Sequence, residues 1–118
     1  MSQSQRYKYV DIDEALKLIG GYEEIYRKLV RAFLENQKEL IAYIDERLSN
    51  DLKEVRRAVH SVKGISQNLG AMRLYDVAHQ LEKAIVDEVG MDVITIYYDE
   101  FKAVFLGTFE ELKAIDSE

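Results

Sequence analysis

The sequence contains no cysteine and no proline. The absence of cysteine excludes disulfide bonds, thiol catalysis and cysteine-containing metal sites, and it is compatible with a reducing compartment. Proline breaks helix interiors because it lacks an N–H and clashes with the preceding turn, so no segment here is forced to break. With 118 residues, of which 47% are hydrophobic and 32% charged, the composition favours one helical domain over residues 1–118 and disfavours a β-sheet fold.

The sequence also lacks an excess of positive charge and any long apolar run. Its 16 lysine and arginine residues are outnumbered by 22 acidic residues, which gives a net charge of −6 at pH 7. Nucleic acid and acidic membrane surfaces are therefore poor partners, and another protein is the better candidate. No apolar run approaches the ~20 residues of a membrane span, and the polar N-terminus is unlike a secretory signal. We expect a cytoplasmic monomer without membrane insertion.

Apolar residues recur at spacings of three and four along most of the chain, which is the period of an amphipathic helix. Residues 1–9 lack this period and are expected to be a loose tail. A short helix follows, capped by Asp11 or Asp13 and ended by Gly20-Gly21. The longer patterns predict four further helices over residues 22–48, 51–69, 71–89 and 92–116. In the first of these, Gln37 is among the inward-facing positions. Because the links are short, we predict an all-α, antiparallel up-down-up-down four-helix bundle with the short first helix across one end.

The third of these longer helices contains the residues with the clearest chemical meaning. His60 lies off the apolar seam, so its ring is expected to face solvent or the rim of the packing interface. Arg56, Lys63 and Gln67 share its side of the helix, whereas Gly64, one turn further on, places no side chain over the ring. A glycine inside a helix costs about 0.5–1 kcal/mol relative to alanine, so this glycine indicates a need for clearance beside the histidine.

A neutral imidazole is a competent nucleophile, and a lysine beside it can stabilise an anion attached to the ring, most naturally a phosphoryl group. The pattern His60-x-x-Lys63-Gly64 followed by Leu69-Gly70 resembles the phosphorylation motif of histidine-containing phosphotransfer (HPt) domains of two-component phosphorelays. The resemblance extends over nearly the whole chain, through Ile12-Asp13, Leu16, Gly20-Gly21, Tyr26, Leu29 and Phe33 upstream and Gly70-Ala71, Leu74, Ala78, Leu81 and Glu82 downstream.

Two positions depart from that family's pattern. Val59 and Val62 stand where many members have alanine just before the histidine and leucine two residues after it. Both changes are conservative, because they exchange one apolar side chain for another in the helix seam.

The resemblance implies a function and a role for each motif residue. His60 would accept a phosphoryl group from the phospho-aspartate of a response-regulator receiver domain, or from a sensor histidine kinase of the hybrid type, and pass it to another receiver. Lys63 would stabilise the phosphoryl group and Gly64 would admit the partner. Such a chain is a phosphocarrier rather than an enzyme and needs no cofactor, since Mg²⁺ and the catalytic aspartates belong to the receiver. His79 suggests no metal site, because a third ligand is not evident.

Two other functions stay open at this point. The chain could be the phosphoacceptor domain of a chemotaxis-type histidine kinase, excised from a longer protein. It could also be a helical adaptor that binds a receiver without phosphotransfer, for which loss of the histidine is the expected mark, whereas His60 is present. Acid-labile phosphate on His60 would distinguish both relay functions from an unrelated adaptor.

The remaining candidate residues carry less specific signals. Gln67 could hydrogen-bond the ring or the phosphoryl group, and Arg56 could steer an acidic partner or merely solvate the helix. In the family, the partner's helix lies against apolar residues near the histidine, partly on the first helix. This suggests that a partner docks on the apolar residues of the first helix, which are Ile12, Leu16 and Ile19. The same three residues could instead plug the end of the bundle.

Overall fold

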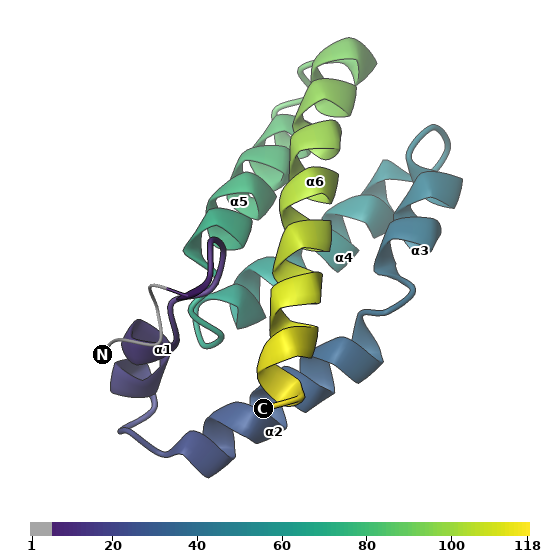
Figure 1. Cartoon of the computed structure of the whole chain (residues 1–118). Coiled ribbons are helices and arrows are strands. Elements are labelled where there is room, and N and C mark those ends of the chain that lie inside the picture. Colours follow the sequence, from purple (N-terminus) through teal and green to yellow (C-terminus); the bar gives the residue numbers. More distant parts are fainter. Residues whose placement is uncertain (1–5) are drawn as a thin grey trace.

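The computed structural model describes residues 6–118, which contain helices and no strand (Figure 1). The predicted all-α fold is confirmed. The helices are α1 (Ile12–Leu18), α2 (Glu23–Asn36), α3 (Leu40–Arg47), α4 (Leu52–Ser66), α5 (Met72–Val86) and α6 (Met91–Asp116). Within these described residues, no helix is both long enough and apolar enough to span a membrane.

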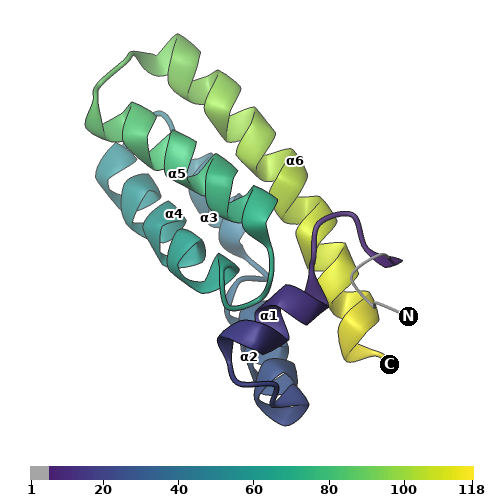
Figure 2. The same ribbon diagram turned by 90° about the vertical axis from the view of Figure 1, so that its left-hand side faces the viewer.

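The helices form an elongated bundle. Helices α4 and α5 form one antiparallel hairpin, and α5 and α6 form the next (Figures 1 and 2). Helix α3 packs on α4, whereas α2 packs on α6 and α1 lies beside α2 at one end of the molecule. The largest fully buried side chains between them include Phe33, Ile44, Leu69, Leu74, Leu81, Phe101 and Leu112.

The single helix predicted over residues 22–48 is wrong, because the chain breaks between α2 and α3. Helix α2 ends at Asn36, and Gln37 closes it by donating its backbone N–H to the Phe33 carbonyl at 2.9 Å. Residues 36–39 are all polar, so this stretch has no apolar side chain whose burial would favour one continuous helix. Each segment therefore packs where its own apolar face is best buried, α2 on α6 and α3 on α4.

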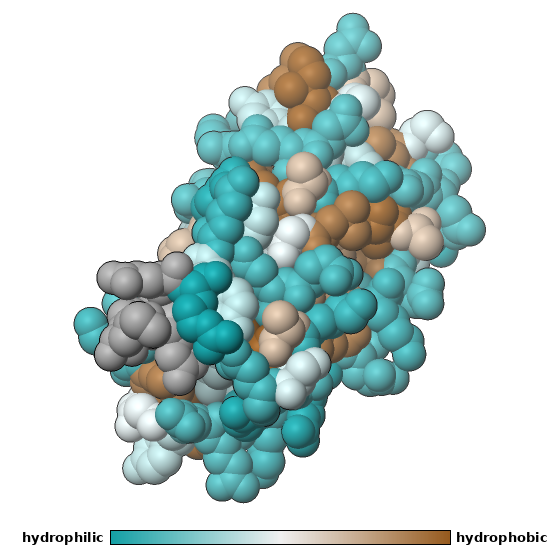
Figure 3. Space-filling view, viewed as in Figure 1, coloured by the Kyte–Doolittle hydropathy of each residue, from teal (hydrophilic) through white to brown (hydrophobic). Residues whose placement is uncertain are grey.

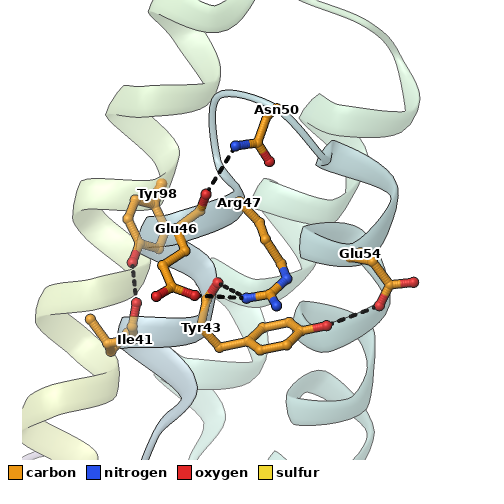
Figure 4. Close-up of polar contacts among 7 residues, drawn as sticks. All are labelled: Ile41, Tyr43, Glu46, Arg47, Asn50, Glu54 and Tyr98. Carbon is orange, nitrogen blue, oxygen red and sulfur yellow. Dashed lines mark hydrogen bonds and ion pairs between the residues drawn. The ribbon is translucent and has the colours of Figure 1, made fainter.

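Polar contacts hold α3 against its two neighbours (Figure 4). The Tyr43 hydroxyl donates to Glu54 of α4 at 3.0 Å, and the Tyr98 hydroxyl of α6 donates to Asp45 of α3 at 2.6 Å. Burial, together with the hydrogen bond to Asp45, raises the pKa of Tyr98, so this hydroxyl stays a donor. The Arg47 guanidinium lies 3.6 Å from the centre of the Tyr43 ring. These contacts join α3 to the first turn of α4 on one side and to α6 on the other.

The N-terminal segment is held more firmly than the predicted loose tail. Residues 1–5 of that tail lie outside the described residues, but Lys8, Tyr9 and Val10 donate their backbone N–H groups to the Glu111 carboxylate at 2.9, 2.8 and 3.1 Å. The Tyr9 ring lies where a Cβ on Gly107 would overlap it. The prediction is therefore wrong for residues 6–9, because one carboxylate of α6 satisfies three consecutive backbone donors.

The short turns follow the predicted capping chemistry. The Asp11 and Asp51 carboxylates accept the N–H groups of Glu14 and Glu54 at 3.0 and 3.3 Å, which caps α1 and α4. Gly70 ends the turn after α4 with φ +76°. Because Gly70 has no side chain, the segment before α1 can approach it closely; a Cβ on Gly70 would overlap the Asp11 carbonyl. The Asp11 N–H donates to the Gly70 carbonyl at 2.9 Å. The turn thereby anchors the N-terminal segment beside the end of α4.

Candidate functional site

The candidate site is centred on the exposed face of α4. Val55, Val59 and Val62 are fully buried along the inner face of this helix. His60 lies outside that seam, as the helical spacing predicts, and its side chain is 64% exposed. An imidazole is therefore presented to solvent from a helix whose opposite face is fixed in the core.

A buried carboxylate from the neighbouring helix fixes the orientation of this ring. Glu82 of α5 is only 8% exposed, and its Oε2 lies 2.7 Å from Nδ1 of His60. Its other oxygen, Oε1, accepts a hydrogen bond from Nζ of Lys63 at 2.6 Å. Arg56 approaches Oε2 more loosely, at 3.9 Å. One carboxylate therefore joins three α4 side chains into a charged cluster.

The Glu82 contact determines which ring nitrogen is available for chemistry. An ionised carboxylate can only accept hydrogen bonds, so Nδ1 of His60 carries the proton. In the neutral imidazole the lone pair then lies on Nε2, which points away from Glu82 on the far side of the ring. The site thus presents an unprotonated nitrogen outwards, with its tautomer set by a second residue.

The local charges keep Glu82 ionised. Burial by itself would raise the pKa of this carboxyl, but the hydrogen bonds from Lys63 and His60, and the charges of those two groups, outweigh burial. The pKa of Glu82 is consequently lowered from its ordinary value of 4.5. The carboxylate is therefore available as an acceptor throughout the neutral range.

The other motif residues occupy distinct positions around the ring. The Lys63 side chain is only 18% exposed and is directed at Glu82. Gly64 is exposed, and a Cβ added to it would meet nothing within 4 Å, so packing gives no reason for a glycine there. Gln67 is exposed at the C-terminal end of α4 and has no hydrogen bond to the cluster. The structure thus brings His60, Lys63 and Arg56 together but leaves Gln67 apart.

Comparison with known proteins identifies the family. The model of the Hpt domain matches residues 28–104, which include α3 to α5 and all of the charged cluster around His60. The chain belongs to the Hpt domain family. No curated protein and no solved structure gives a significant match. Hpt domains are phosphocarriers of two-component phosphorelays that interact with receiver domains and are not classical enzymes.

The apolar residues predicted to dock a partner differ in their exposure. In this Hpt domain Ile12 is only 4% exposed and packs into the core, which favours the plug interpretation for that residue. Leu16 and Ile19 are half-buried against the core. The surface seen in Figure 3 is largely hydrophilic with scattered apolar areas, and the exposed apolar residues near α1 are Leu18, Tyr22 and Ile25.

Glu82 is the site residue that sequence reasoning missed as a functional group. The pattern of α5 already contained a signal, because Glu82 lies among inward-facing apolar positions, between Leu81 and Ala84. An acidic residue at such a position must find partners, since an unpaired buried charge is costly. The antiparallel hairpin of α4 and α5 supplies them.

The second histidine lies outside the cluster. The His79 ring is exposed and stacks on Tyr75, with ring centroids 6.4 Å apart. Within residues 6–118, no group of three or more histidine or acidic side chains is arranged to hold a metal ion.

The lowered pKa of Glu82 predicts a specific acid sensitivity. A carboxyl whose pKa is lower in the folded state contributes stability that is present above its ordinary pKa of 4.5 and is lost as the pH falls through the lower folded value. We expect the free energy of unfolding of the wild type to fall more steeply below this pH than that of Glu82→Gln, as measured by urea denaturation across an acid series. If the free energies of unfolding of the two proteins fell equally steeply with pH, the stabilisation of the Glu82 carboxylate by His60 and Lys63 would be contradicted.

Proposed function

We propose that His60 is the phosphoacceptor of this Hpt domain, taking a phosphoryl group on Nε2 from a receiver phospho-aspartate and passing it to the aspartate of another receiver. The observation that carries this proposal is the 2.7 Å contact between Nδ1 and Glu82 on an otherwise exposed ring. That contact leaves the outward nitrogen unprotonated. A hybrid sensor histidine kinase and response regulators are the proteins that would supply such receivers.

No proton has to leave the site during phosphoryl transfer. The Nε2 lone pair attacks phosphorus, the N–P bond forms, and the P–O bond to the aspartyl carboxylate breaks with its electron pair on the departing oxygen. The ring keeps its proton on Nδ1 and becomes cationic, facing the Glu82 carboxylate at 2.7 Å. In the onward step the N–P electron pair returns to Nε2 as the next aspartate takes the phosphoryl group.

The neighbouring residues take supporting roles in this proposal. Glu82 orients the ring and stabilises the cationic form, while Lys63 neutralises Glu82 and adds positive charge beside the phosphoryl group. Gly64 leaves open the approach to the ring, and exposed Gln67 could contact a bound partner. The half-buried Leu16 and Ile19 would form the edge of the partner surface.

Labelling is expected to depend on a receiver domain. In this family the receiver supplies Mg²⁺ and the catalytic aspartates, so acetyl phosphate with Mg²⁺ should label this protein poorly and an added receiver should label it quickly. The measurement is incorporation of radioactive phosphate, with a receiver whose phosphorylated aspartate is replaced by asparagine as the control. Efficient labelling by acetyl phosphate and Mg²⁺ in the absence of a receiver would contradict the proposal.

A further inference from the structure

His60 lies at one end of a cationic cleft on α4. Lys53, Arg56, Arg57 and His60 line a cleft of about 180 Å³. Their spacings of three and four place all of them on one face of the helix. The chain as a whole carries a net charge of −6, so this cleft is a local concentration of positive charge. Lys63 is not part of its lining.

The basic residues near the ring differ in how firmly a carboxylate holds them. Lys63 is bound to Glu82 at 2.6 Å and its side chain is only 18% exposed. Arg57 is paired with Glu54 at 3.4 Å. Arg56 is 49% exposed, and its contact with Glu82 is long, at 3.9 Å, to an oxygen that His60 already occupies. Arg56 is thus the cation near the ring that is most readily released.

The direction of helical side chains also favours Arg56. Side chains on an α-helix lean towards its N-terminus, so the His60 ring leans over the turn that carries Arg56 rather than over the turn that carries Lys63. Lys53 lies two turns away, about 10 Å along the helix axis. Among the cleft residues, Arg56 therefore combines nearness to the ring with a charge that is only weakly paired.

We propose that the cleft holds the phosphoryl group carried by His60 and that Arg56 contacts its oxygens, whereas Lys63 stays bound to Glu82 and adds its charge without contacting them. A planar guanidinium binds a phosphoryl group through two parallel N–H donors, which an ammonium cannot do. When Arg56 leaves Glu82, that carboxylate keeps Lys63 and the ring, so no buried charge is left unpaired. This inference rests on His60 being the phosphoacceptor.

The phosphorylated protein offers a direct test. The protein is loaded with phosphoramidate, a small donor that needs no receiver, and the titration of its phosphoryl group is followed by ³¹P NMR. A guanidinium contact favours the dianion and lowers the pKa of the phosphoryl group. We expect Arg56→Gln to raise this pKa by about one unit, a tenfold change in proton affinity. Arg56→Lys should restore part of the shift. Arg31→Gln, which removes an exposed arginine on α2 outside the cleft, is the matched control and should leave the pKa unchanged.

The outcomes separate this inference from the proposed function. A wild type that takes no phosphate on His60 would overturn the proposed function itself. A wild type that is loaded on His60, but has the same phosphoryl pKa as Arg56→Gln, would overturn the role of Arg56 alone. A larger shift in Lys63→Gln or Arg57→Gln than in Arg56→Gln would overturn it as well. Because Arg56 is half-exposed, the variants are expected to fold, and their thermal unfolding verifies this.

Discussion

His60→Gln is expected to abolish phosphoryl labelling while the protein still folds. The side chain is 64% exposed, so its replacement removes little buried surface, and Lys63 continues to neutralise Glu82 at 2.6 Å. A glutamine amide offers no nucleophilic nitrogen, so no N–P bond can form. The measurement is labelling by a phosphorylated receiver, together with thermal unfolding of both proteins.

The chain provides its own control for this experiment. His79 is the other histidine, is exposed and lies outside the charged cluster, so His79→Gln should be labelled at the wild-type rate. The label on the wild type should be stable in alkali and lost in acid, as expected for phosphohistidine. Phosphate retained by His60→Gln, or lost in His79→Gln, would contradict the assignment of the site. An adaptor that binds receivers without phosphotransfer would show no label in any of the proteins.

Gly64→Gln is expected to slow phosphoryl exchange with a receiver at least ~10-fold, equivalent to a barrier increase of about 1.4 kcal/mol. A side chain at position 64 leans over the turn that carries His60 and would obstruct the approach of the phospho-aspartate. Stability should move the other way. A Cβ at Gly64 meets nothing within 4 Å, so better helix propensity should stabilise the protein by up to about 0.5–1 kcal/mol.

Two further variants, Gly64→Ala and Lys63→Ala, separate obstruction of the partner's approach from loss of positive charge. Gly64→Ala adds one methyl group in open space and should slow transfer much less than Gly64→Gln. Both Gly64 variants should react with phosphoramidate at nearly the wild-type rate, because a small donor does not need the same clearance. Lys63→Ala should also slow transfer, through weaker charge stabilisation. If Gly64→Gln exchanges phosphate with a receiver as fast as the wild type, the glycine does not serve partner access.

The predicted and observed helices agree where the signals are local. Caps such as Asp11 and Asp51, and the left-handed Gly70, act within a few residues and can be read from the chain. The break between α2 and α3 depends instead on packing, because α2 and α3 bury their apolar faces against different helices. Glu111 lies about a hundred residues from the backbone groups that it binds, and no local pattern predicts that pairing.

The site residues on α4 could be predicted from the sequence, whereas the residue that α5 contributes could not. His60, Lys63 and Gly64 lie within two turns of one helix, so their spacing alone indicated an open imidazole with a cation beside it. Glu82 comes from the next helix, 22 residues after His60. Its role depends on the register of the α4–α5 hairpin, which short-range periodicity does not determine. The same register explains why Lys63 is directed at Glu82 rather than at solvent.

The most direct test of the proposed site is to identify the nitrogen that carries phosphorus. The protein, labelled with ¹⁵N in its histidines, would be phosphorylated by a receiver and examined by ¹⁵N and ³¹P NMR. We predict that phosphorus is bonded to Nε2 of His60 and that Nδ1 stays protonated, with a hydrogen-bonded proton signal that is lost in Glu82→Ala. Phosphorus on Nδ1, on His79 or on a residue other than histidine would contradict the proposed site.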